Sequence, residues 1–311
     1  MDHRRSEVSD TVTSARKTVP IARLHAGCAE RGALNDVSVL YYPVRKNMDI
    51  KNAIRVPVLM YHRVGETRND QERRYCVEPA RFALHMHSLE QAGWRAVSLA
   101  DFFLWLDGNM EFPEKSFLLT FDDGFLGVHE HAAPVLCRMN WLPTIFLVSQ
   151  LIGKRDIWPG KRSSAADTHP LMSVHHIREL HSLGFGFQSH TRHHVDLPAL
   201  DDTNLRLELK GAREDLEGIL GEPVLHLAYP YGRHDERVLH AVREAGYQSA
   251  FSTQPGFNRR AIDRFRLRRL DVFGTDSPAA LCRKIEFGCN DGSLWHSIRY
   301  RTSRVTSRLG F

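Results

Sequence analysis

Two adjacent carboxylates follow a short apolar run in the sequence. Residues Ser116–Gly124 read S-F-L-L-T-F-D-D-G, which places Asp122 and Asp123 at the end of a predicted buried strand. In parallel α/β folds, reactive groups gather at the carboxyl ends of strands. The segment therefore suits a site with two acidic side chains, although an aspartate turn or a helix N-cap would give the same pattern.

A histidine cluster follows a second predicted strand. Residues Gly186–His194 read G-F-Q-S-H-T-R-H-H. His190 and His194 are four positions apart, so a helical turn or a tight loop can aim both at one cation, whereas His193 would point elsewhere on a helix. Two imidazoles and one carboxylate form a common open zinc site that leaves one position for water. Solvent-facing loop histidines are the alternative interpretation.

A third predicted strand ends in a tight turn, A-Y-P-Y-G, at Ala228–Gly232. Pro230 fixes the turn, and Gly232 would let the backbone approach a ligand closely. The main-chain N–H of Tyr231 is then a candidate oxyanion donor. By itself this segment would be an ordinary strand-ending turn.

Together the three segments resemble carbohydrate esterase family 4, the polysaccharide deacetylases, whose domain is a distorted (β/α) barrel. Thr120–Gly124 match the first motif of this family. His190, Thr191 and His194 match its H-[S/T]-x-x-H motif. Pro230–Gly232 match the core of its P-[Y/W]-G motif, which implies substrate contacts at this turn. The three motifs occur in family order, and this makes the resemblance far more specific than any one of them.

The resemblance extends over roughly residues 54–275 and implies a site. Pro57–Val64, P-V-L-M-Y-H-R-V, is similar to the opening strand of the subgroup that acts on poly-N-acetylglucosamine. By this resemblance Asp122 is the general base, and the Tyr231 N–H helps to stabilise an oxyanion. A divalent metal, expected to be Zn²⁺, would polarise the amide and activate water. Its implied ligands are Asp123, His190 and His194.

The chain departs from the family pattern at two positions. Many members have an arginine two residues before the motif proline, where it pairs with the catalytic base, and here that residue is Ala228. The late L-x-x-H motif supplies the acid that protonates the leaving amine, but R-R-L-D-V-F-G follows Leu267. Asp271 and His62 are both candidates for that acid. A structural, hydrogen-bonded role for His62 is equally open.

The elements around these residues alternate between strand and helix. This alternation predicts an α/β fold, a distorted (β/α) barrel of about seven parallel strands with outer helices. Apolar stripes predict helices at Phe82–Leu89, at Leu205–Ile219 with Asp201 or Asp202 as N-cap, and at Val238–Ala245. The predicted strands are Pro57–Tyr61, Arg95–Ser98, Phe117–Phe121, Thr144–Val148, Gly186–Ser189, Leu225–Tyr229, Ser249–Ser252 and Leu267–Val272.

The barrel is expected at residues 54–275, between two segments with weaker patterning. Residues 1–53 have little hydrophobic periodicity and are predicted to be a poorly ordered extension. Residues 276–311 are predicted to form a basic helical tail. That tail would be either a solvated helix or a point of peripheral membrane contact.

Composition narrows the class of protein. The chain has 311 residues, 42% hydrophobic and 25% charged, which excludes a wholly disordered chain, a collagen-like fibre and a small disulfide scaffold. No apolar run approaches the ~20 residues of a membrane span. The net charge of +5 is spread over both signs, so nucleic-acid binding is not favoured. Five scattered cysteines and a charged N-terminal segment without a signal-peptide core predict a cytoplasmic location.

These observations favour a metal-dependent hydrolase. The expected reaction removes N-acetyl groups from N-acetylhexosamine units of a poly- or oligosaccharide and releases acetate. An O-acetyl esterase would use the same fold and metal. A catalytically inactive carbohydrate-binding homologue is the third alternative, because the arginine and the late histidine of the family are missing. Retention of Asp122 argues against it, since a binding site has little use for a base beside the metal.

Overall fold

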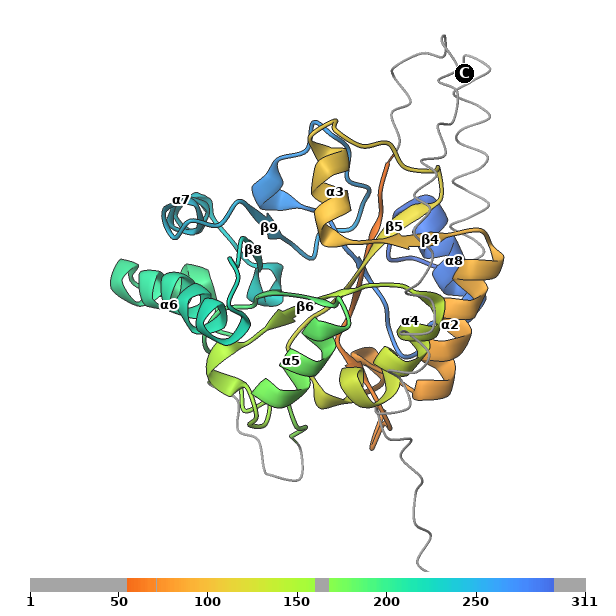
Figure 1. Cartoon of the computed structure of the whole chain (residues 1–311), viewed down its shortest axis with the longest axis horizontal. Coiled ribbons are helices and arrows are strands. Elements are labelled where there is room, and N and C mark those ends of the chain that lie inside the picture. The colour runs from red at the N-terminus through yellow and green to blue at the C-terminus, as the bar shows by residue number, and fades with distance from the viewer. Residues whose placement is uncertain (1–54, 71, 160–167, 294–311) are drawn as a thin grey trace, which may run out of the picture.

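In the computed structural model, residues 55–70, 72–159 and 168–293 are described, and their strands form one main parallel sheet (Figure 1). The order is β10-β1-β5-β6-β7-β8-β9, and β4 also pairs with β5. All eight predicted strands are present; most are shorter than predicted, β7 has the predicted bounds, and β5 begins one residue earlier. They are β1 (Val58–Tyr61), β4 (Arg95–Val97), β5 (Ser116–Phe121), β6 (Thr144–Leu147), β7 (Gly186–Ser189), β8 (His226–Ala228), β9 (Ser249–Phe251) and β10 (Leu270–Asp271).

One segment links the two edges of this sheet. Leu267 pairs with Phe251 of β9, and its backbone N–H donates to the Ala250 carbonyl over 3.0 Å. Three residues later, Leu270 pairs with Leu59 of β1 at the other edge. The sheet therefore curls into the distorted (β/α) barrel that the sequence predicted.

Helices cover the outside of the curled sheet. In Figure 1, α6 and α7 lie on the left, and α2, α4 and α8 lie on the right. The three predicted helices are confirmed, and the Asp201 carboxylate caps α6 by accepting the Asn204 N–H. The α-helices are α2 (Pro79–Gln91), α3 (Leu99–Leu106), α4 (Ala133–Met139), α5 (Val174–Ser182), α6 (Asp202–Leu220), α7 (Glu236–Glu244) and α8 (Pro278–Phe287).

Strand side chains alternate between two apolar cores. Leu119 and Ile145 pack in the core that the outer helices share. Their neighbours Leu118 and Phe146 belong to a second core, which includes Trp105 of α3. This alternation follows from the two-residue period of a strand. Helix α3 therefore packs against the inner face of the curled sheet. The carboxyl ends of the strands remain available to form a site.

Helix α8 extends the folded unit beyond the predicted boundary at residue 275. Leu281 and Ile285 are buried in the main core, and the Lys284 ammonium lies 2.5 Å from the Asp276 carboxylate. Residues 276–287 are thus part of the domain rather than of a tail. The predicted extension at 1–53 and the basic residues from 294 onward lie outside the described residues. Within the described ranges, no helix combines the length and apolar character that a bilayer span requires.

A small two-stranded ribbon, which the sequence did not predict, borders the barrel. It pairs β2 (Arg63–Val64) with β3 (Cys76–Val77). The connecting loop is fixed by Glu72, which lies 2.7 Å from Arg63 and 2.7 Å from Arg68. These two arginines help to hold the pKa of Glu72 at about 2, against the opposing effect of burial. The ribbon therefore presents a well-held loop next to the end of β1.

Candidate active site

The side chains with predicted chemical roles gather at the carboxyl ends of neighbouring strands. Asp122 and Asp123 follow β5, and His190 follows β7. The turn at Pro230–Gly232 follows β8, and His62 follows β1. These ends lie at one edge of a parallel sheet, which is where such folds place reactive groups.

A left-handed turn brings both aspartates to the same side. Successive side chains of a strand point to opposite faces. Asp123 leaves the strand conformation with φ 72°, and Gly124 follows with φ 78°. A Cβ at Gly124 would lie 2.6 Å from a Leu147 side-chain carbon, so this position needs glycine for packing as well. The strained turn is what allows two adjacent carboxylates to share one site.

Three side chains converge in the arrangement of a metal site. Asp123 Oδ1 lies 3.5 Å from His190 Nε2 and 3.4 Å from His194 Nε2. The ligands of a tetrahedral Zn²⁺, each about 2.1 Å from the ion, lie roughly 3.4 Å apart. All three residues are buried, and their ligand atoms lie within 4.8 Å of one another. The donor set therefore fits a divalent transition metal, and a predicted ligand triad is brought together.

The surroundings of the two histidines orient their ring nitrogens. His190 Nδ1 donates to the Ala228 carbonyl over 2.8 Å, which leaves Nε2 as the lone-pair atom. Burial lowers the pKa of His190 and favours this neutral form. The His194 ring packs against both Trp158 and Tyr231, with centroids 4.3 and 4.7 Å away. Trp158 was not among the predicted site residues.

Arg269 pairs with the predicted base. Its Nη1 donates to Asp122 Oδ1 over 2.6 Å, and its Nη2 donates to Oδ2 over 2.8 Å. Its Nε donates to the Ser252 carbonyl over 3.0 Å, and the side chain is fully buried. Burial alone would raise the pKa of Asp122, but Arg269 and then His190 outweigh it and lower this pKa to about 2. Asp122 is therefore a buried carboxylate that stays ionised.

Arg269 takes the place of the arginine that is missing at Ala228. It comes from the segment that closes the barrel, two residues after the inward-facing Leu267. In a strand, residues two apart share a face, so Arg269 had to point inward with Leu267. This two-residue spacing is the signal in the sequence from which an inward-facing Arg269 could have been predicted.

His62 and Asp271 remain the two candidates for the general acid. The His62 imidazole lies close enough to Asp122 for this carboxylate to favour its protonation. Burial has the larger, opposite effect, and the pKa of His62 is about 4. Its Nδ1 is buried and has no hydrogen-bond partner among the residues that the structure describes. Asp271, by contrast, accepts a hydrogen bond from Asn290 Nδ2 over 2.9 Å, and burial raises its pKa.

The P-Y-G turn at Pro230–Gly232 contributes the Tyr231 ring to the site, and Gly232 has a packing role. Tyr231 has left-handed φ of 59°, and its ring lies against His194. Gly232 was predicted to let the backbone approach a ligand. The structure gives another reason, because a Cβ there would lie 2.1 Å from Thr253 Oγ1. Pro230 is buried beneath this turn.

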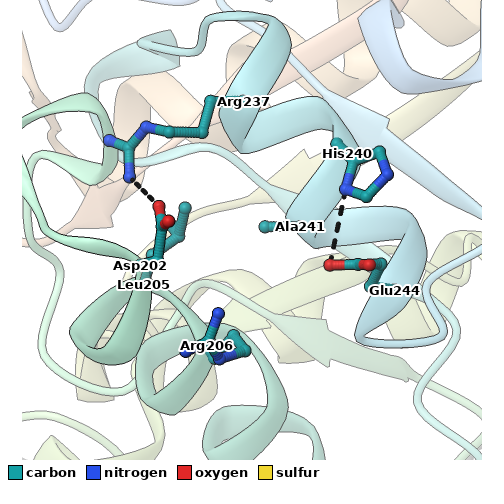
Figure 2. A pocket seen from close by; sticks show the side chains of 7 residues that line it. All are labelled: Asp202, Leu205, Arg206, Arg237, His240, Ala241 and Glu244. Atoms are coloured by element: carbon teal, nitrogen blue, oxygen red, sulfur yellow. Dashed lines mark hydrogen bonds and ion pairs between the residues drawn. The ribbon is translucent and has the colours of Figure 1, made fainter.

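A separate pocket lies between α6 and α7 (Figure 2). It has a volume of about 180 Å³, below the roughly 300 Å³ of typical ligand sites. Arg237 and Asp202 face each other across 2.9 Å, and His240 lies 3.4 Å from Glu244. Four of its charged or titratable side chains are thus paired with one another, and the pocket contains none of the candidate active-site residues.

Comparison with known families identifies the family of this domain. A model of the polysaccharide deacetylase family matches residues 109–250. The chain contains a polysaccharide deacetylase domain. The matched segment of this deacetylase includes both aspartates and both metal-site histidines. His62 and Arg269 lie outside it.

Curated relatives and solved structures agree with this assignment. The deacetylase domain is similar to YxkH of Bacillus subtilis, with 27% identity over 232 residues, 75% of this chain and 76% of that protein. The poly-β-1,6-N-acetyl-D-glucosamine N-deacetylase of Staphylococcus epidermidis is 25% identical over 212 residues, 64% of this chain and 69% of its own.

Among solved structures, a polysaccharide deacetylase from Bacillus cereus is 28% identical with a TM-score of 0.60, over 73% of this chain and 67% of that one. The deacetylase PplD of Streptococcus pyogenes is 22% identical with a TM-score of 0.65, over 75% of this chain and 99% of that one. At this identity PplD supports the fold alone.

Loss of one triad histidine should lower metal binding by this deacetylase domain. In a His190→Ala variant two ligands remain, so the metal-to-protein ratio after dialysis should fall well below that of the wild type. His193→Ala is the matched control, because the His193 ring lies 2.6 Å from Glu208 on α6 rather than in the triad. Metal analysis by mass spectrometry measures both. A full metal complement in His190→Ala would contradict the ligand assignment.

Proposed function

We propose that this chain is a metal-dependent N-deacetylase acting on N-acetylhexosamine units of a poly- or oligosaccharide. The observation that carries the proposal is the buried Arg269–Asp122 pair beside the Asp123, His190 and His194 triad. A carbohydrate-binding module has no need of an ionised base next to a metal site. The Staphylococcus epidermidis relative is a poly-β-1,6-N-acetyl-D-glucosamine N-deacetylase, and this supports the choice of substrate class.

The proposed reaction hydrolyses an amide. The oxygen of water bonds to the acetyl carbon, the carbon–nitrogen bond breaks, and the products are acetate and a free amine on the sugar. A divalent ion on the triad would polarise the carbonyl and lower the pKa of a water to about 7. Asp123, His190 and His194 orient that ion through their converging ligand atoms.

Asp122 would take the proton of the attacking water. Its Oδ2 faces the triad, because it lies 3.9 Å from His190 Nε2. Each carboxylate oxygen keeps a second lone pair while Arg269 occupies the first. Arg269 fixes the orientation of the carboxylate and keeps it ionised before the proton arrives. In this role Arg269 is a positioning residue.

The developing oxyanion and the leaving amine need one further group each. The Tyr231 main-chain N–H is our proposed oxyanion donor, a kind of contact worth about 3 kcal/mol. Its support is the position of Tyr231 against His194. For the amine nitrogen we favour His62 as the acid, since the Asp271 carboxylate is held by Asn290. With a pKa of about 4, His62 is neutral at neutral pH, so it would take the proton from Asp122, whose pKa is about 2, and pass it to the amine. A buried Nδ1 without a partner also suggests that His62 awaits a contact from substrate or water.

Matched substrates test the proposed activity. The purified metal-loaded protein should release acetate and an equal amount of primary amine from an N-acetylglucosamine pentamer. An O-acetylated hexose oligomer of the same length should give far less acetate. Acetate from the O-acetyl substrate alone would favour an esterase. Oligomer binding without acetate from either substrate would favour the inactive carbohydrate-binding homologue.

The choice of acid has its own test. His62→Gln should lower kcat for the N-acetylglucosamine pentamer about 10²-fold or more, as for loss of a general acid. Asp271→Asn is the matched variant at the other candidate, and its kcat should stay within several-fold of the wild type. If Asp271→Asn shows the larger loss, the roles are reversed.

A further inference from the structure

Three of the six large apolar side chains that are exposed among the described residues lie on loops near the proposed active site. Tyr75, Ile157 and Tyr231 are 47%, 56% and 44% exposed. Ile157 precedes Trp158, which packs on His194, and the Tyr231 ring also packs against His194. Large apolar groups at the rim of a polar cleft are a common mark of ligand contact.

Tyr75 lies on the His62 side of the site. Its ring centroid is 4.9 Å from that of His62. His62 in turn lies close enough to Asp122 for the charge of this carboxylate to act on it. Phe273 packs edge-on to Tyr75 at 6.4 Å. The Arg74 guanidinium lies 5.3 Å from the Tyr75 ring and 5.4 Å from the Phe273 ring. The group is therefore an aromatic platform of two rings with the Arg74 cation lying over them.

The backbone holds this platform in place. The Tyr75 N–H donates to the Glu72 carbonyl over 3.1 Å, and the Tyr75 carbonyl accepts the Arg63 N–H over 3.0 Å. The Glu72 carboxylate is paired with Arg63 and Arg68. A half-exposed ring on a fixed loop loses little conformational entropy when a ligand stacks on it.

We infer that Tyr75 stacks against a sugar next to the one being deacetylated, a subsite on the His62 side of the reacting residue. This inference rests on the proposed function. A pyranose has an apolar face of C–H groups and a rim of hydroxyls. The C–H face suits the electron-rich face of an aromatic ring, and Arg74 can donate to the hydroxyls. A glycan chain held at the triad would pass over His62 and bring its neighbouring sugar to Tyr75.

Chain-length preference provides the test. We define it as kcat/KM for an N-acetylglucosamine pentamer divided by kcat/KM for 4-nitrophenyl acetate, which offers an acetyl group but no neighbouring sugar. In Tyr75→Ala this ratio should fall about three- to tenfold, mainly through a higher KM for the pentamer. Tyr75→Phe keeps the ring and should keep most of the ratio. Leu104→Ala, which removes an exposed apolar side chain on α3, is the matched control.

The outcomes separate the subsite from the proposed function. If the wild type releases no acetate from the pentamer, the proposed function fails. If the wild type is active and Tyr75→Ala keeps the wild-type ratio, the subsite is wrong. The stacking role is also wrong if Tyr75→Phe loses as much as Tyr75→Ala, because the hydroxyl would then be the important group.

Discussion

Replacing Asp122 with asparagine should lower kcat about 10²- to 10⁴-fold, the range for removal of a general base. The amide cannot take a proton from water, while the triad of Asp123, His190 and His194 is unchanged. The metal-to-protein ratio should therefore stay near that of the wild type. Acetate release and metal analysis on the same preparation measure the two effects.

The adjacent carboxylate supplies the contrast for this experiment. Asp123→Asn alters a triad ligand and should lower metal content as well as activity. A wild-type rate in Asp122→Asn would remove Asp122 from the mechanism. Loss of metal in Asp122→Asn would place this carboxylate among the ligands instead.

Local patterns were sufficient to predict most of the barrel and the triad. Strands such as Phe117–Phe121 and Thr144–Val148 were recognisable because buried strands are short, apolar and bounded by turns. Asp123, His190 and His194 could be grouped because they follow strands in motifs of known order. The strand ends of a parallel sheet then bring them together, although the left-handed turn at Asp123 was not foreseen.

Contacts between distant segments could not be predicted from local patterns. Arg269 and Asp122 are 147 residues apart, and their pairing depends on how the barrel closes. Trp158 and Tyr75 likewise reach the site from loops whose paths have no periodic pattern. The packing role of Gly232 was not foreseen for the same reason, since its close neighbour Thr253 follows a different strand.

Removing the partner of the base should impair both stability and catalysis. Arg269→Met leaves Asp122 as a buried carboxylate without its guanidinium, which typically costs about 3–5 kcal/mol of the free energy of unfolding. Without the guanidinium, burial raises the pKa of Asp122. The acid limb of the kcat/KM profile should shift to higher pH, because the base is protonated over a wider range.

The pH dependence of stability follows from the same pair. Because the folded pKa of Asp122 is about 2 and the unfolded value is about 3.9, the pair stabilises the wild type above about pH 4. This contribution is lost as the pH falls through the folded pKa. The difference in free energy of unfolding between wild type and Arg269→Met should therefore be largest near neutrality and shrink toward pH 2. Denaturant unfolding at several pH values measures it, and a difference independent of pH would contradict the linkage.

A double variant distinguishes a catalytic pair from a merely structural one. Asp122→Asn combined with Arg269→Met removes both buried charges, so its loss of stability should be smaller than the sum of the losses in the two single variants. Its activity should stay as low as that of Asp122→Asn, because the base is still missing.

Arg269→Lys keeps one positive charge but loses the two-pronged contact, so it should be intermediate in stability and in the shift of the acid limb. If Arg269→Met lost stability but kept the wild-type pH profile and kcat, Arg269 would support the fold alone.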